Sequence, residues 1–280
     1  MSAVACTVHL VTLQPGHDKD DFLASLNDPT LLNQASYLLK GKAHGWVHQP
    51  HRSGERNRLL AREWQYFLLT RQQELPGPLG EIVGPHMSVD VSIPKAQHDN
   101  IVKNRRSEPV PETPPLPDEW PGDGGIPGAL ISDDDGSSLK VGELRLDRTM
   151  ADFLTTALPD GVQNAPVSLM NFFKYPGDDS SVHDAYMEGF KNNFGNAAGA
   201  TVKYMGPVRS SLRYSNDESS NESTEGERGA WNDANLVQYD TIWHYAYMLS
   251  TDVYAELNKQ KIAGLEDTCI LLVSEMELAS

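Results

Sequence analysis

The sequence predicts an α+β protein made of two consecutive β-α-β-β-α-β units. Apolar runs with strand and helix periodicity recur in the same order in both halves. Matching Pro-Gly turns at Pro15-Gly16 and Pro176-Gly177 lie 161 residues apart (176 − 15). The chain has 280 residues, which suits two domains of about 100–150 residues each. We therefore expect a first module at 1–105, a linker at 106–145 and a second module at 146–280.

The predicted linker has a composition that disfavours a packed core. Seven prolines occur between Pro109 and Pro127, and glycines and the acidic run 133–135 follow. Such a segment buries too little apolar surface to offset the entropy lost on ordering. A second polar stretch, 215–228, contains no apolar residue. It predicts a mobile loop at 209–230 inside the second module.

Each module is predicted to contain four strands and two helices. The strands of the first module are expected at 8–13, 41–48, 63–69 and 87–93, and those of the second at 167–173, 199–206, 234–239 and 268–273. In the first module, the acidic residues 18–21 predict a helix start before Phe22 and Leu26. In the second module, helices are expected from 182 to 190 and from 242 to 249, where apolar residues recur at helical spacing.

This element order is the split β-α-β arrangement of ferredoxin-like folds. One such unit covers a single face of its sheet with helices, so a second copy can cover the other face. The alternative is that two unrelated α+β domains share common turn chemistry by chance.

The second half resembles the dimeric α/β-barrel superfamily, specifically its small, largely uncharacterised stress-associated members. The resemblance rests on LMNFFKY (169–175), Tyr186, WNDANLVQY (231–239), MLSTDVY (248–254) and LEDT (265–268), and it covers about 110 residues (166–277). The first half matches only in element order. The resemblance implies two fused ferredoxin-like modules that form an intrachain dimeric α/β-barrel. That superfamily includes cofactor-free polyketide cyclases, monooxygenases and isomerases, haem enzymes, and proteins without known activity, so fold alone does not fix function.

Charge and composition exclude several classes of partner. The chain carries 39 acidic and 23 basic residues, a net charge of −16. This balance disfavours binding to nucleic acid or to an anionic membrane surface. No stretch approaches the roughly 18 apolar residues of a membrane span, and no basic, apolar leader is present. Two cysteines, Cys6 and Cys269, favour a reduced, cytoplasmic protein. We expect a small-molecule substrate as the partner, with a homodimer also allowed.

The strongest catalytic candidates lie on the second predicted strand. His44, Trp46 and His48 alternate there and are predicted to share one face. Two imidazoles beside an indole suit proton transfer on a stacked aromatic substrate. The alternative is a partly solvated face, or histidines that bond only to the backbone.

Other polar strand residues extend the predicted site. A buried Glu63 would have a raised pKa and act as a base, whereas a rim position would pair it with Arg62 or Arg71. Asn171 would donate to a developing oxyanion or simply satisfy a strand end. The predicted substrate-binding residues are Trp46, Tyr66, Phe173, Tyr204, Trp231 and Tyr239. Tyrosines in strands are, alternatively, ordinary core residues.

No metal and no cofactor are predicted. His44 and His48, four residues apart on a strand, would lie about 13 Å apart, too far to share one ion. His51 would join them only if the chain turned at Pro50. Nucleophile-elbow and phosphate-loop motifs are absent from the sequence. Haem binding stays as a third hypothesis, since it needs an axial histidine in a large cavity.

The leading functional hypothesis is a cofactor-independent acid/base enzyme of the cyclase or isomerase type, as found in secondary metabolism. It would act on a small apolar, aromatic or polyketide-like substrate inside the barrel. The alternative is a non-catalytic binding or stress-associated protein whose barrel is packed shut by aromatics. An open pocket reached by His44 or His48 would favour the enzyme, whereas a filled interior with those histidines on the outer surface would contradict the enzyme hypothesis.

Overall fold

The computed structural model describes residues 2–27, 37–51, 53–75, 77–104, 115–118, 120, 125–132, 140–159, 161–195, 199–215 and 231–276. It is a mixed α+β structure around one nine-stranded sheet in the order β6-β8-β5-β9-β2-β3-β1-β4-β7. The strands are β1 (Ala3–Leu13), β2 (Tyr37–His48), β3 (Tyr66–Thr70), β4 (Val83–Pro94), β5 (Val167–Lys174), β6 (Ala200–Pro207), β7 (Arg213–Ser215), β8 (Asp233–Tyr239) and β9 (Asp267–Glu275). Each pair of neighbouring strands is antiparallel.

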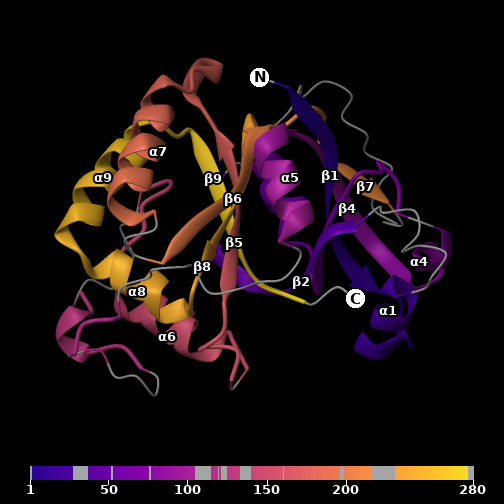
Figure 1. The fold of residues 1–280 in the computed structure, drawn as a ribbon, viewed down its shortest axis with the longest axis horizontal. Helices are drawn as coiled ribbons and strands as arrows, with labels where there is room; N and C mark the ends of the chain where they lie inside the picture. Colours follow the sequence, from indigo (N-terminus) through magenta and orange to yellow (C-terminus); the bar gives the residue numbers. More distant parts are fainter. Residues whose placement is uncertain are drawn as a thin grey trace.

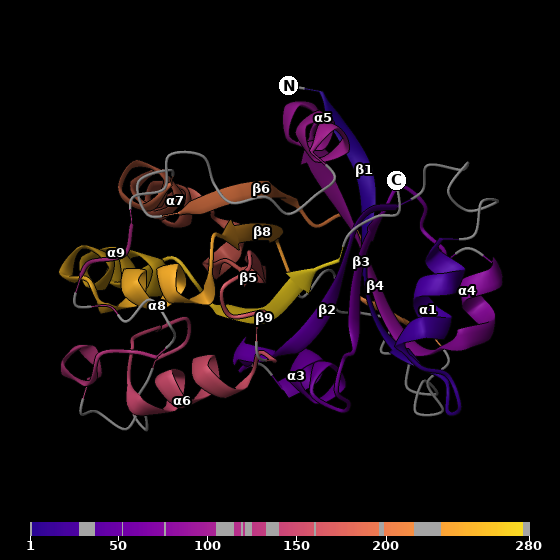
Figure 2. The same ribbon diagram turned by 60° about the horizontal axis from the view of Figure 1, so that its bottom comes forward.

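Two groups of helices flank the strands (Figures 1 and 2). The helices are α1 (Lys19–Leu26), α3 (Ser53–Leu59), α4 (Gly77–Ile82), α5 (Lys95–Lys103), α6 (Arg148–Thr156), α7 (Ser181–Phe194), α8 (Ile242–Ser250) and α9 (Asp252–Ala263), with short 3₁₀ turns at Gly128–Leu130 and Pro176–Asp178. Helices α1 and α4 lie beyond the strands of the first half, and α6 to α9 beyond those of the second. Within the described residues, no helix is long and apolar enough to cross a membrane.

Both halves arrange their main strands in the same way. The first half has the order β2-β3-β1-β4 and the second has β6-β8-β5-β9, which in each case places the second, third, first and fourth strands side by side. The halves are joined by pairing of β2 with β9. The two halves therefore share one order of strands in the sheet.

The sheet also closes on itself at the far side, where β4 meets the segment after β6. Val208 forms an isolated bridge with Val91, and the Arg209 N–H donates to the Asp90 carbonyl oxygen at 2.7 Å. The next residues form β7, which pairs with β4. A continuous surface of strands thus separates an enclosed face from an outer face.

Gly206 lies where the two edges approach most closely. A Cβ atom at this position would lie 1.9 Å from the Ser92 carbonyl oxygen. We therefore expect Gly206→Ala to lower the free energy of unfolding by about 1–3 kcal/mol, because the backbone of β4 has to move away. Urea denaturation measures the change. Gly80→Ala is the matched control, since its added Cβ meets nothing within 4 Å, and an equal effect of both substitutions would contradict the close approach.

The enclosed face is filled by apolar side chains from both halves. The following residues of this cluster each expose 2% or less of their surface: Cys6, Val8, Leu10, Phe67, Met87, Val89, Met170, Phe172, Leu236, Leu271 and Val273. Leu59 of α3 and Ile101 of α5 pack into the same cluster. Of the two alternatives, an open pocket or a filled interior, the described residues show the filled interior, since these side chains occupy the space.

Parts of the predicted linker pack against the second half. Trp120 and Leu144 are buried in the cluster that α6 to α9 form with the outer face of the sheet. Their apolar side chains offset the ordering cost that the proline-rich composition suggests. The remaining linker residues 106–114, 119, 121–124 and 133–139 lie outside the described residues, as do 216–230 of the predicted loop.

Candidate functional site

The three candidates on β2 do not share a face, so that prediction is wrong. Two irregularities shift the register of β2 against β9, one between Ala43 and Gly45 and one between Trp46 and His48. Each extra residue reverses the alternation of side chains that a regular strand would show. Trp46 pairs with Leu271 and packs with the enclosed cluster, whereas His48 lies opposite Ile270 of the outer cluster.

Both β2 histidines are held by polar neighbours. The Nε2 of His44 lies 2.7 Å from Ser274 Oγ, and the Gly142 N–H donates to the Nε2 of His48 at 3.3 Å. Burial lowers the pKa of His44 to about 4 and that of His48 to about 3. The charge of Lys261 contributes to the lowered pKa of His48. Both rings are thus neutral near pH 7.

The predicted aromatic residues of the barrel belong to its packed interior. Trp46, Tyr204 and Trp231 all join the enclosed cluster. The Tyr204 hydroxyl donates to Met170 Sδ at 3.1 Å, and the Trp231 ring lies 5.8 Å from that of Phe172. The three aromatic side chains pack against protein atoms, so the enclosed space has no room for a substrate to stack on them.

Glu63 and Tyr66 lie away from this interior. Glu63 is exposed and precedes β3, which fits the rim position and not the buried base of the two alternatives. The strand begins three residues later than predicted, at Tyr66. Just before it, the Gln65 N–H donates to the Val11 carbonyl oxygen at 3.0 Å, and the Gln65 side chain accepts the Leu13 N–H at 2.7 Å. Tyr66 lies on the outer face of the first half and stacks on Phe22 at 4.2 Å.

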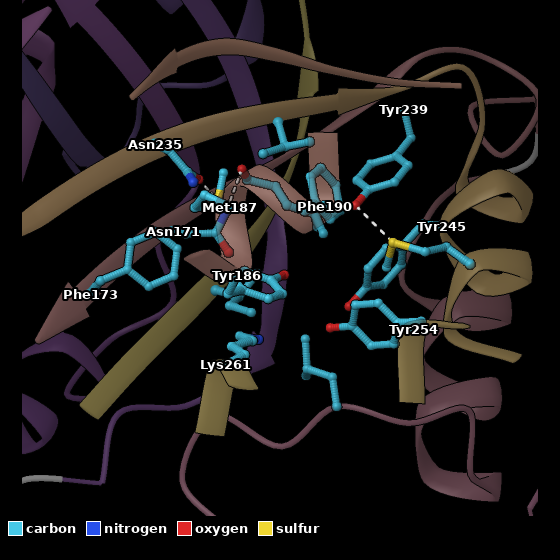
Figure 3. Close-up of a pocket in the computed structure, with 15 residues that line it drawn as sticks. Asn171, Phe173, Tyr186, Met187, Phe190, Asn235, Tyr239, Tyr245, Tyr254 and Lys261 are labelled. Atoms are coloured by element: carbon cyan, nitrogen blue, oxygen red, sulfur yellow. Dashed lines mark hydrogen bonds between the residues drawn. The ribbon is translucent and has the colours of Figure 1, made fainter. Parts of the chain in front are cut away.

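Three other predicted residues, Asn171, Phe173 and Tyr239, come together at a small cavity (Figure 3). The cavity has a volume of about 40 Å³ and lies between the outer face of β5, β8 and β9 and the helices α7, α8 and α9. Its lining is rich in hydroxyl groups, from Tyr186, Tyr239, Tyr245 and Tyr254. This volume accommodates about three water molecules.

Lys261 is the cavity residue that our sequence analysis missed. Its side chain lines the cavity and is 2% exposed. Burial lowers the pKa of its ammonium group to about 7. None of the 15 residues that line the cavity is acidic. A signal was present in the sequence, since Tyr254, Leu257 and Lys261 recur at i, i+3 and i+7 and so place the lysine on the buried face of α9.

The tyrosine hydroxyls of the cavity are donors. The hydroxyls of Tyr186 and Tyr254 share a hydrogen bond, and burial raises the pKa of both groups. The Tyr245 hydroxyl is buried and has no hydrogen-bond partner within the described structure, and burial raises its pKa as well. Figure 3 shows these hydroxyls and Lys261 directed toward the same space. They stay protonated at neutral pH. The Tyr245 hydroxyl can donate to a bound oxygen atom, whereas Tyr239 donates to Met248 Sδ at 3.5 Å and one of Tyr186 and Tyr254 donates to the other.

Asn171 does not have a free donor, so its predicted role toward an oxyanion finds no support. Its amide nitrogen donates to the Leu169 carbonyl oxygen at 3.0 Å and to Asn235 Oδ1 at 2.7 Å. Both amide hydrogens are therefore used within the strands. The Asn171 side chain therefore donates hydrogen bonds within the sheet and has no donor left for a ligand.

A buried histidine stands near the cavity on α7. The His183 Nδ1 lies 3.1 Å from the Tyr175 hydroxyl, which donates to Asp233 Oδ2 at 2.6 Å. The ring of His183 contacts the cavity residues Phe173 and Tyr186. Burial, with a contribution from the charge of Lys261, lowers its pKa to about 3. Its Nε2 has no partner among the residues that the structure describes, so a neutral imidazole with an available acceptor lies close to the amine.

Metal binding finds no support in the described ranges, where no three His, Cys, Asp or Glu side chains cluster suitably. The histidines make other contacts instead. His44 bonds to Ser274, His48 packs against His51 at 5.2 Å, and His183 bonds to Tyr175.

Comparisons with known proteins leave the family open. No protein-family model and no curated protein matches the chain. A solved structure of a protein of unknown function from Rhodopseudomonas palustris is 14% identical, with a TM-score of 0.35, and the match covers 51% of this chain and 99% of that one. A putative monooxygenase from Lactobacillus acidophilus is 6% identical (TM-score 0.45, 98% and 94% covered), and one from Fusobacterium nucleatum is 8% identical (TM-score 0.44, 99% of each chain covered). Similarity at this level carries no conclusion about the function of this chain.

Proposed function

We propose that the chain is a cofactor-independent acid/base enzyme whose site is the cavity between β5, β8, β9 and helices α7 to α9. One observation carries the proposal, namely the buried Lys261 amine in a cavity wall without a carboxylate. A buried ammonium is costly, so a lysine in a described cavity lining without a carboxylate is suited to proton transfer near neutral pH. The proposed site thus moves from the filled interior, where we expected it, to the outer face of the sheet.

The proposed chemistry is removal of a proton from carbon next to a carbonyl group. The neutral Lys261 amine accepts the proton, and the Tyr245 hydroxyl donates to the carbonyl oxygen as it gains negative charge. Return of the proton to the enolate oxygen or to a different carbon completes an isomerisation. This outcome belongs to the class that the sequence predicts.

The cavity restricts the substrate to a very small molecule. Pockets that bind drug-sized ligands have volumes of about 300 Å³ or more, whereas this cavity has about 40 Å³. A substrate of a few non-hydrogen atoms, with one carbonyl oxygen and a short apolar part, suits the Phe190, Met187 and Leu144 walls. A polyketide-sized substrate does not fit.

Hydrogen–deuterium exchange of acetone tests the proton-transfer step without knowledge of the natural substrate. In D₂O at neutral pH, we expect the protein to accelerate loss of the methyl proton signal at least about tenfold over buffer. Lys261→Met should abolish the acceleration, because it removes the base and keeps a side chain of similar length. One-dimensional NMR follows the signal.

Lys259→Met is the control for this experiment. Lys259 lies two residues away, is exposed and pairs with Glu256 at 2.6 Å. It should leave the exchange rate unchanged. Exchange that is no faster than in buffer, or that Lys261→Met leaves unaltered, would refute the enzyme proposal.

The second candidate function is a non-catalytic small-molecule-binding protein. The filled enclosed face favours it, because that interior acts as a structural core. Saturable binding of acetone that depends on Lys261 and produces no exchange would select this candidate.

We also propose that the two halves are copies of one ferredoxin-like unit that together imitate a dimeric α/β-barrel. The shared order of strands in the two halves supports this proposal. The closure of β4 against the segment after β6 supports it as well. The proposed modules keep the predicted bounds 1–105 and 146–280.

A further inference from the structure

We propose that Lys261 is a covalent site that condenses with small aldehydes and ketones to form an imine. The inference rests on the cavity of the proposed function and deepens it by assigning a nucleophile and a substrate class. Proton transfer needs a basic amine only, whereas imine formation also needs space at the nitrogen and a donor for the departing oxygen.

The first requirement is an amine that reaches free volume. Lys261 lines the cavity with a side chain that is 2% exposed, and Figure 3 shows it directed into the same space as the tyrosine hydroxyls. With no carboxylate in the wall, no salt bridge from the lining holds the nitrogen in the ammonium form. A lysine desolvated in this way is the activated form that protein nucleophiles use.

The second requirement is a hydrogen-bond donor for the carbonyl oxygen. The Tyr245 hydroxyl is buried in the cavity wall without a partner among the described residues. An unpaired buried hydroxyl costs free energy that a bound oxygen atom would recover. The Tyr186 and Tyr254 hydroxyls share a hydrogen bond and are a second polar group in the cavity wall.

The product suits the cavity better than the charged lysine does. A neutral imine removes the ammonium charge from a site lined by apolar and aromatic side chains. The other titratable groups near the nitrogen are neutral at pH 7. They are Tyr186 and His183 on α7, Tyr245 on α8, Tyr254 on α9, Tyr239 on β8 and His48 on β2.

The reaction is a condensation without redox change. The lone pair of Lys261 Nζ attacks the carbonyl carbon, a C–N bond forms, and the C=O electron pair moves to oxygen, which is protonated. Loss of this hydroxyl group as water, with one proton supplied and one released from nitrogen, leaves the C=N bond. The balance is one amine and one carbonyl compound giving one imine and one water.

Reductive trapping with acetaldehyde and sodium cyanoborohydride at pH 7 tests the proposal on the full-length protein. Cyanoborohydride reduces the imine and leaves an ethyl group on the reacting lysine, which mass spectrometry of peptides locates. About one half of Lys261 is neutral at this pH, against roughly one in 2,500 of an ordinary lysine. We expect Lys261 to be ethylated at least about tenfold faster than Lys259. The ratio of rates is smaller than the ratio of neutral fractions because acetaldehyde has to enter the cavity.

Two variants sharpen the result. Tyr245→Phe should slow labelling of Lys261 at least about threefold and leave Lys259 unaffected, since it removes the unpaired donor only. Lys259→Met should leave labelling of Lys261 unchanged. Lys261 labelled no faster than Lys259 would overturn the imine proposal.

Acetone exchange tests the proposed function, and reductive trapping tests the imine, so the two results are interpreted separately. Lys261-dependent acetone exchange without an adduct overturns the imine and retains the acid/base enzyme. An adduct at Lys261 without exchange supports the imine and overturns the proton-transfer reaction. The two measurements therefore fail independently.

Discussion

Replacement of Lys261 by methionine should stabilise the protein strongly at acidic to neutral pH. Burial lowers the pKa of Lys261 from its ordinary value of 10.5 to about 7 in the folded chain. At about 1.4 kcal/mol per pKa unit, the protonated Lys261 lowers the free energy of unfolding by ~5 kcal/mol below pH 7. We expect Lys261→Met to raise the free energy of unfolding by about 3–5 kcal/mol at pH 6, measured by urea denaturation.

The pH dependence identifies the cause. Between pH 7 and about 10.5, the unfolded chain keeps the lysine proton and the folded chain has lost it, so wild-type stability rises relative to the variant by ~1.4 kcal/mol per pH unit. The difference between the two proteins should therefore shrink over this range and become small near pH 10.5. Lys259→Met should show no such trend. A constant difference at all pH values would show that Lys261 is not desolvated.

The second large effect concerns the packed interior. Phe172→Ala should lower the free energy of unfolding by about 3–5 kcal/mol, because it leaves a hole among side chains that cannot collapse fully. Phe172 is 1% exposed and contacts the Trp231 ring. Urea denaturation monitored by tryptophan fluorescence and by far-UV circular dichroism measures the loss.

The same denaturation experiment tests whether the two halves unfold together. The interior cluster takes side chains from both halves, so both probes should report one shared transition with a lower midpoint and an unchanged slope. Phe172→Leu should cost less, and Val253→Ala, at a position 49% exposed, should change stability by no more than about 0.5 kcal/mol. Two separate transitions would contradict a shared interior.

Much of the secondary structure of the second half follows directly from local sequence. The runs at 167–173, 234–239 and 268–273 consist mainly of apolar and β-branched residues, and each lies within an observed strand. The spacing from Val182 to Phe190 predicts the helix that is found at Ser181–Phe194. Such elements are set by interactions over a few residues, so periodicity is sufficient to place them.

The site depends on features that periodicity does not contain. The two register shifts of β2 arise from its pairing with β9, which lies more than 200 residues away in the chain. They separate His48 from Trp46 despite their alternation. Asn171, Phe173 and Tyr239 were selected from strand composition, but their grouping around Lys261 depends on how α9 packs. A lysine in a helix is assigned to solvent by default, although its position among Tyr254 and Leu257 indicated burial.

The pairing of β9 between β5 and β2 has a consequence for synthesis of the protein on the ribosome. β9 is the last strand in the chain order, yet it lies near the middle of the sheet. Until its residues leave the exit tunnel, β2 and β5 each present an unpaired edge that another nascent chain can join. Completion of the sheet, and protection of both halves from misassembly, therefore waits until the residues of β9 leave the exit tunnel.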